Sequence, residues 1–408
     1  MSNVTTYSVT TLSSSTEYFY RVRAYNDIEE STSSNVIELE TLPNFFVSTW
    51  NTANSGVSAN DEIALPLVDY GTYNFDVIYD GNTIKTITDY TDNLIEFSDG
   101  SGVKQIQITG TIEGWAFANG GDKLKITEIS NYGEIVFIEN DAEEFQGGSN
   151  LDVTATDAPD ISAKNSLFAF FRNCTSLTAF GQGWSTGSIV TFERMFSGCS
   201  AFDDSEVLNL NVSAATSLRN MFTSSAINQD LTGWNTANVE NWDGFLSACT
   251  SYNQPINVLS FTSATNMRDM LNGCTTFNQP FTGMATGSVT NMQGMLEGAT
   301  AFNQALTGLN TSSVTNFRRF LKDASSFDQN CGVLDISSAT DMSQFLFNVG
   351  ISTANYDSTL IAFEGTPPNL NVTFDGGSST YTLGGAAETA RTSLVNTYLW
   401  TITDGGGI

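Results

Sequence analysis

The sequence predicts an α/β solenoid of 25-residue strand–turn–helix units, preceded by all-β sandwich segments. Three observations predict it: apolar positions recur every 25 residues, each repeat changes from extended to helical spacing, and the first part of the chain alternates apolar with polar residues. One of five apolar columns contains Leu177, Phe202, Ile227, Tyr252, Phe277, Phe302 and Phe327. A fixed period in the twenties is typical of stacked turns, because no single unit can bury its own apolar face.

One repeat shows how a unit is expected to fold. The run from Phe277 to Phe281 reads as an extended segment that ends at a glycine turn. From Val289 to Leu296, apolar residues follow at i, i+3, i+6 and i+7, which is helical spacing. We therefore expect a parallel sheet on one face of the stack and short helices on the other.

The first segment, residues 1–42, contains short alternating runs. Tyr18 to Asn26 alternates apolar and polar residues, and a second extended run covers residues 35–41. The segment resembles the last three strands of a fibronectin type III domain. Three strands alone expose an apolar face and an open edge, so we expect the remaining strands to come from a preceding chain or to have been lost upstream.

Residues 44–118 predict a small β-sandwich. The runs 72–79 and 103–109 alternate with period two, and the dipeptides Asp80-Gly81 and Asp99-Gly100 mark turns. The segment resembles a PKD-like domain. Residues 79–82 read Tyr-Asp-Gly-Asn, where that family has Trp-Gly-Asp-Gly.

The repeat unit itself resembles the BspA-like leucine-rich-repeat surface proteins. The matching words include Phe-Asn-Gln at 277–279 and 302–304 and Val-Thr-Asn-Met at 289–292. By this resemblance, residues 119–165 form an N-terminal cap with irregular first turns, 166–350 the leucine-rich-repeat-like solenoid and 351–408 a C-terminal cap. The resemblance implies a surface location and an adhesive or recognition role, and it brings no catalytic residues. Related repeats also occur in phage structural proteins.

Composition excludes several classes of function. The chain has 15 Lys and Arg against 44 Asp and Glu, a formal charge of −29, which repels nucleic acid. It has no histidine, which removes every His-dependent catalytic triad and the commonest transition-metal ligand. The residues after Met1 do not resemble a signal peptide, and no apolar run is long enough to insert into a membrane. We expect no enzyme activity, no metal and no cofactor.

Two repeated positions could bind a ligand or serve only the fold. The cysteines Cys174, Cys199, Cys249 and Cys274 share a repeat position with Ala and Ser, which favours buried reduced thiols over disulfides or zinc. The Asn-Gln pairs at 228–229, 253–254, 278–279 and 303–304, with Asp203 and Asp328 at the ends, suit a row of ligand-binding amides. These side chains are better suited to a ladder that forms hydrogen bonds with polar groups of the backbone.

Charged residues give weaker signals. Glu193, Arg219, Asp243, Arg268, Gln293 and Arg318 form a column of mixed charge, which we interpret as the solvated face of the helices. The acidic loops at Asp80, Asp89, Asp92 and Asp99 contain oxygen ligands that calcium prefers, but they lack an Asp-x-Asp-x-Asp-Gly loop.

The candidate binding residues are the outward positions of the predicted strands. They are Thr232, Asn257, Thr282 and Thr307. Such a row of small polar side chains suits a protein or glycan partner on a cell surface, and equally a face that avoids aggregation. The first hypothesis is therefore an extracellular recognition or adhesion protein on a bacterial surface or a virion exterior. The alternative is a structural fibre or decoration protein of a phage virion or surface filament, which contacts neighbouring subunits in a larger assembly.

Overall fold

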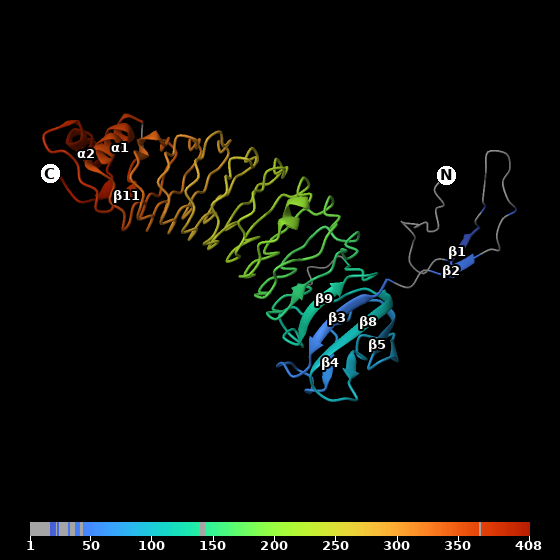
Figure 1. The fold of residues 1–408 in the computed structure, drawn as a ribbon. Coiled ribbons are helices and arrows are strands. Elements are labelled where there is room, and N and C mark those ends of the chain that lie inside the picture. Colours follow the sequence, from blue (N-terminus) through green and yellow to red (C-terminus); the bar gives the residue numbers. More distant parts are fainter. Residues whose placement is uncertain are drawn as a thin grey trace, which may run out of the picture.

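The computed structural model describes residues 17–21, 23, 32, 37–40, 44–138, 143–366 and 369–408. A β-sandwich lies at one end of the main body, a long stack of chain coils follows it, and two helices cover the far end (Figure 1). In the first segment, residues 1–42, β1 (Glu17–Tyr20) pairs antiparallel with β2 (Ile37–Glu40). Apart from residues 21, 23 and 32, the rest of the segment predicted to resemble the last strands of a fibronectin type III domain lies outside the described residues.

The sandwich is a six-stranded sheet with a smaller two-stranded sheet. The large sheet has the order β10-β9-β3-β8-β5-β6, and β4 pairs with β7. The strands are β3 (Phe46–Asn51), β4 (Glu62–Ala64), β5 (Tyr73–Tyr79), β6 (Thr83–Ile87), β7 (Leu94–Glu96), β8 (Val103–Ile112), β9 (Ile126–Asn131) and β10 (Asp152–Val153). Asp80, Gly81 and Asn82, with φ of 44°, 67° and 121°, connect β5 to β6 as a three-residue hairpin loop, in which the Asn82 N–H donates to the Tyr79 carbonyl at 3.1 Å.

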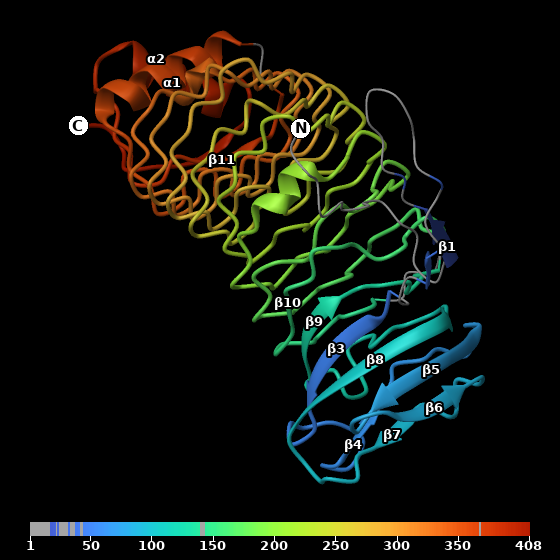
Figure 2. The same cartoon turned by 45° about the vertical axis from the view of Figure 1, so that its right-hand side comes forward.

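The sandwich and the coils share one hydrophobic core. β9 runs beside β3, β10 runs beside β9, and the chain leads from them into the coils (Figure 2). A row of parallel bridges joins Glu113 to Val136 and Val136 to Asp160. The buried Phe145 ring then lies 5.6 Å from the ring of Phe171, which in turn stacks on Phe196 of the next coil at 5.9 Å.

Residues 166–350 form a stack of coils, named here the coil stack. Single parallel bridges connect successive coils at Ser166, Thr191, Ser217, Asn241, Asn266, Asn291, Asn316 and Asp341. Side chains 25 residues apart lie above one another, since the Phe302 ring is 6.0 Å from both Phe277 and Phe327, and the three rings are nearly parallel.

The prediction of an α/β solenoid with strand–turn–helix units is wrong. Residues 166–350 contain no α-helix, only the short 3-10 turns η1 (Ser205–Asn209) and η2 (Cys331–Val333), and the chain consists mostly of strands and loops. The predicted helix, Val289 to Leu296 in the example unit, contains Asn291, which forms the bridge to the next coil. The predicted strand, Phe277 to Phe281 in the same unit, lies in a loop that leads into a turn. We name the eight residues that start at each bridge residue, such as 291–298, the bridged segment of a coil.

Backbone hydrogen bonds explain why the bridged segment is not helical. Met292 and Gly294 donate to the carbonyls of Asn316 and Arg318 in the next coil, at 3.0 and 2.9 Å, whereas Met295 donates back to Met292 at 3.2 Å. Alternate amides therefore bond between coils. Gly294, like Asp269 and Arg319 at equivalent positions, has a positive φ of 51–61°, which an α-helix does not tolerate.

Two α-helices and two strands follow the coil stack. They are α1 (Thr353–Gly365), β11 (Thr373–Asp375), α2 (Ala386–Asn396) and β12 (Thr401–Thr403). A bridge from Met342 to Phe374 continues the row of bridges into β11, and β12 pairs parallel with β11. Among the described residues, neither helix is long and apolar enough to cross a membrane.

Candidate functional site

The predicted binding residues lie in turns and not in strands. Thr232, Asn257, Thr282 and Thr307 occupy equivalent turns away from the bridged segments; the three threonines are exposed and Asn257 is half-buried. The Asn257 amide donates to Thr282 Oγ1 at 3.0 Å, and Thr232 Oγ1 donates to Asp230 at 2.6 Å. The structure brings Asn257 and Thr282 into contact. The turn column, as we name these four residues, is a row of polar groups at one-coil spacing.

A ladder of amides stands beside the turn column. Asn278 N–H donates to Asn253 Oδ1 at 2.9 Å, and Asn303 N–H donates in turn to Asn278 Oδ1 at 2.9 Å. Asp203 and Asp328 perform the same role at the ends, since they accept from the backbone of Asn228 and Ser352. The interpretation of these side chains as a ladder for backbone groups is confirmed.

Removing one ladder residue tests this role. We expect Asn278→Ala to lower the free energy of unfolding by about 0.5–1.5 kcal/mol, because the backbone N–H of Asn303 loses its acceptor at an exposed position. Asn278→Asp keeps an acceptor oxygen, as Asp203 does naturally, and we expect a smaller loss. Urea unfolding followed by tryptophan fluorescence measures both variants, and equal losses would contradict the ladder.

The cysteines are part of the core. All five are free and buried, and burial raises the pKa of the Cys249 thiol to about 12. Cys249 Sγ donates to the Phe222 carbonyl at 2.9 Å, and Cys274 Sγ to the Leu246 carbonyl at 3.0 Å. The prediction of buried, reduced thiols at this repeat position is therefore confirmed.

Thiol reactivity provides a second test of that burial. At pH 8 we expect the folded chain to react with a thiol reagent far more slowly than the unfolded chain, because the thiolate is the reactive form and burial disfavours it. Titration with a chromogenic disulfide, before and after addition of guanidinium, counts the reactive thiols. Rapid reaction of Cys249 in the folded protein is the contrary outcome.

The mixed-charge column lies on the bridged segments and not on helices. Arg219 Nε lies 3.4 Å from Asp243 Oδ2, and Arg268 Nε lies 3.0 Å from Asp269 Oδ2. Glu297 accepts from Lys322 at 2.7 Å, and this hydrogen bond raises the pKa of the lysine. We name the exposed side of the bridged segments the charged face.

An open groove of about 430 Å³ lies at the first coils. It is lined mostly by hydroxyl, amide and carboxylate residues, and it contains Asp152, Thr178, Gln182, Asp204 and Glu206. Asp152 accepts from the backbone N–H of Thr178 at 2.7 Å, and Asp204 accepts from that of Glu206 at 3.0 Å. Burial raises the pKa of Asp204. These two carboxylates therefore already serve the backbone.

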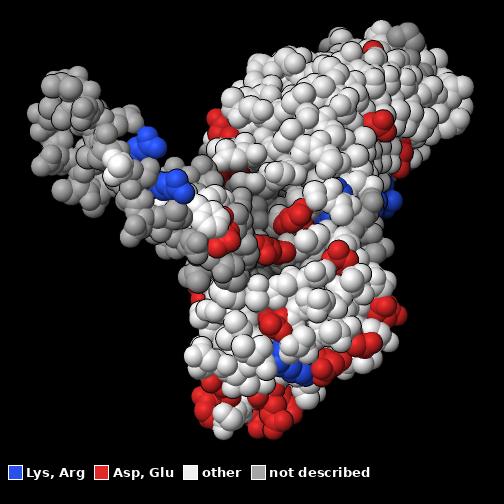
Figure 3. Space-filling view, turned by 90° about the vertical axis from the view of Figure 1, so that its right-hand side faces the viewer, with Lys and Arg blue, Asp and Glu red and all other residues white. Residues whose placement is uncertain are grey.

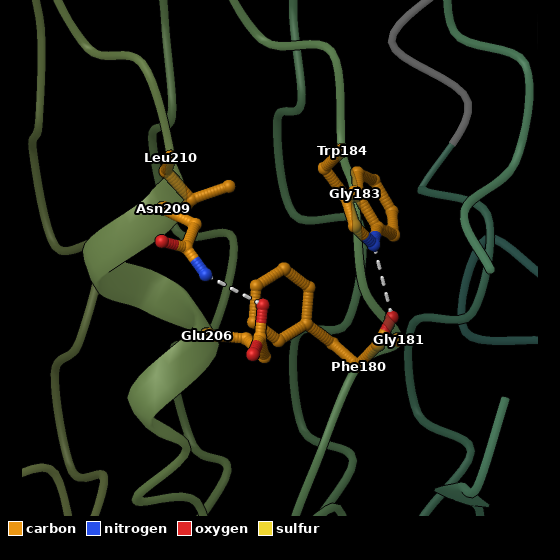
Figure 4. Close-up of a pocket in the computed structure, with 7 residues that line it drawn as sticks. All are labelled: Phe180, Gly181, Gly183, Trp184, Glu206, Asn209 and Leu210. Atoms are coloured by element: carbon orange, nitrogen blue, oxygen red, sulfur yellow. Dashed lines mark hydrogen bonds between the residues drawn. The ribbon is translucent and has the colours of Figure 1, made fainter. Parts of the chain in front are cut away.

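A small hollow next to the groove has apolar walls (Figure 4). It measures about 30 Å³, and Phe180, Trp184 and Leu210 line it with Glu206 and Asn209. Trp184 Nε1 donates to the Phe180 carbonyl at 3.1 Å, and the Asn209 amide donates to Glu206 at 2.8 Å. Sequence reasoning missed both concavities, because they form where η1 displaces one coil from the 25-residue spacing. The available signal was Leu210, which stands one residue later than the 25-residue spacing from Trp184 to Trp234 places it.

The four acidic loop residues of the sandwich are separate from one another. Asp80 accepts from Ser98, Asp89 from Thr91 and Asp92 from Lys85, and Asp99 forms an ion pair with Lys104. Within the part of the chain that the structure describes, no three His, Cys, Asp or Glu side chains are grouped so that they could hold a metal ion.

Comparison with known proteins gives one family. Residues 165–284 and 259–358 match the family described as Mycoplasma protein of unknown function, DUF285. Neither the curated proteins nor the solved structures contain a match. Over the coil stack, the chain is therefore similar to a protein family whose function has not been determined.

Proposed function

We propose that this chain is a non-catalytic recognition protein of a cell or particle exterior, which binds protein or glycan partners through the coil stack. One observation carries the proposal: the same exposed side-chain positions recur at successive coils on a backbone held by bonds between coils. Groups that are held in place before binding lose little conformational entropy when a partner arrives. A row of such groups suits a partner that is itself extended or repetitive.

The turn column is the proposed contact for a neutral partner. Its hydroxyl and amide groups both donate and accept hydrogen bonds, and the neighbouring amide ladder holds the coils in register. Polar groups of this kind match sugar hydroxyls and peptide groups. No metal or cofactor forms part of the proposal.

Binding of the whole chain to glycan arrays and to host cells tests the proposal. We expect binding that Thr232→Ala, Thr282→Ala and Thr307→Ala together weaken at least about tenfold, the loss of roughly 1.4 kcal/mol. The matched control replaces Thr265, Thr290 and Thr315 by alanine at a different exposed column; Thr290 and Thr315 share the coils of Thr282 and Thr307, and Thr265 lies one coil after Thr232. Absence of binding to any glycan or cell would contradict the recognition function, and equal effects of the two triple variants would exclude the turn column.

A structural role in a fibre or virion is the second candidate. It is favoured by β1 and β2, which pair only with each other among the described strands, so that each has one edge to which no described strand is bonded. A neighbouring chain can add a strand to such an edge. Analytical ultracentrifugation over a range of concentrations, with hydrogen exchange at Ile37–Glu40, tests this role. Concentration-dependent assembly with protection of β2 supports it, and a monomer with an unprotected β2 counts against it.

A further inference from the structure

The cations of the coil stack all lie on one side. Every Lys and Arg between residues 166 and 350 falls in a bridged segment: Arg172, Arg194, Arg219, Arg268, Arg318, Arg319 and Lys322. Six carboxylates share these segments, and seven lie elsewhere in the stack. The charged face is therefore close to neutral, whereas the chain has a formal charge of −29. Carboxylates outnumber cations on the side of the molecule drawn in Figure 3.

Three of these arginines occupy one column at every second coil. Arg219, Arg268 and Arg318 each stand two residues after a bridge residue, and the coils between them carry Asp243 and Gln293 at that position. Neighbouring coils in a parallel ladder are about 4.8 Å apart, so the arginines recur at roughly 10 Å. The backbone bonds between coils hold this spacing.

The three guanidinium groups are available to a ligand. Arg318 is exposed and forms no ion pair with another described residue. The side chains of Arg268 and Arg219 are 48% and 39% exposed, and each forms one ion pair, with Asp269 and Asp243 respectively; Asp243 also interacts electrostatically with Arg268. A guanidinium has five N–H donors in a planar fork, so one carboxylate neighbour leaves donors free for a second.

We propose that the charged face binds a linear acidic polysaccharide that carries a carboxylate on alternate sugar rings. A sugar ring with its glycosidic bond is about as long as the rise of one coil, so alternate rings meet alternate coils. Each Arg fork then faces a uronate carboxylate. Asp243 and Gln293 face the neutral rings, whose hydroxyl and amide groups donate to them. The inference rests on the proposed recognition function, and it names the ligand class and the face.

The charge pattern favours this polymer over other polyanions. Nucleic acid carries a phosphate on every nucleotide, so its charges also meet Asp243, the carboxylate between Arg219 and Arg268, and the uncharged Gln293 between Arg268 and Arg318. The large negative charge of the rest of the chain is screened beyond about 8 Å at physiological salt, so a ligand on the charged face meets mainly the local groups. The contacts are partly electrostatic, and we therefore expect binding to weaken as salt increases.

Calorimetry with hyaluronan oligosaccharides, which alternate glucuronate with an uncharged sugar, tests the inference on the whole chain. We expect binding that spans the coils from Ser217 to Asn316 and that Arg219→Gln, Arg268→Gln and Arg318→Gln together weaken at least tenfold. The matched control, Arg21→Gln, Arg23→Gln and Lys85→Gln, changes the net charge equally in the N-terminal segments, and we expect it to bind like the parent chain. Circular dichroism and thermal unfolding verify that both variants are folded.

Three outcomes would overturn the inference: no binding of hyaluronan by the parent chain, equal binding by the two triple variants, or equally tight binding of polyglutamate or single-stranded DNA. A neutral dextran of equal length should not bind. If the arginine variant adheres to cells and glycan arrays as well as the parent chain does, and hyaluronan does not bind, the proposed recognition function stands while the acidic-polysaccharide inference fails.

Discussion

Replacement of Phe302 by alanine is expected to lower the free energy of unfolding by about 3–5 kcal/mol. The ring is fully buried, it lies 6.0 Å from Phe277 and Phe327, and it also contacts Phe281 at 5.2 Å. Its removal leaves a cavity between three coils, which the ladder of inter-coil hydrogen bonds prevents from closing. Urea unfolding gives the loss, and hydrogen exchange shows where the protection is lost.

The location of the effect distinguishes a coil stack from an ordinary core. Stability in stacked repeats depends mainly on contacts between neighbours. We therefore expect faster exchange in the coils around 277–327 and little change in β3 and β8 of the sandwich. Thr307→Ala, an exposed change in the same coil, should stay within about 0.5 kcal/mol of the parent. A uniform increase of exchange through the whole chain would argue against nearest-neighbour coupling.

Replacement of Asp122 by alanine is expected to cost about 3–5 kcal/mol. The carboxylate is fully buried, accepts from the backbone N–H of Val57 and Ala64 at 2.7 Å, and lies 3.8 Å from the ammonium of Lys125. Without it, the buried ammonium keeps only uncharged acceptors, the Ser58 hydroxyl and the carbonyls of the 58–62 loop. Thermal and chemical unfolding measure the loss.

A double variant separates the charge effect from packing. Lys125→Met removes the buried ammonium, so Asp122→Ala with Lys125→Met should be less destabilised than the sum of the single changes. Asp89→Ala, at an exposed carboxylate that bonds only Thr91, is the control and should have little effect. Equal losses for Asp122→Ala and Asp89→Ala would contradict the proposed role of this ion pair.

Local sequence signals identified the parts of the molecule that depend on side-chain burial. The alternation in residues 72–79 and 103–109 corresponds to β5 and β8, and Asp80-Gly81 forms the expected turn. The repeat position of the cysteines indicated their burial. The sequence predicts the candidate site less well, because its pattern places Thr232 and its equivalents in strands and they lie in turns.

The sequence by itself determined the 25-residue period, the apolar columns that stack along it and the amide ladder beside them. Only the tertiary structure decided between a helix and a bridged segment at Val289–Leu296, and it thereby placed the arginine column on the charged face. The apolar spacing i, i+3, i+6, i+7 is compatible with either backbone. The choice depends on carbonyls about one coil away, such as Asn316 for the amide of Met292, and local periodicity contains no information about these partners.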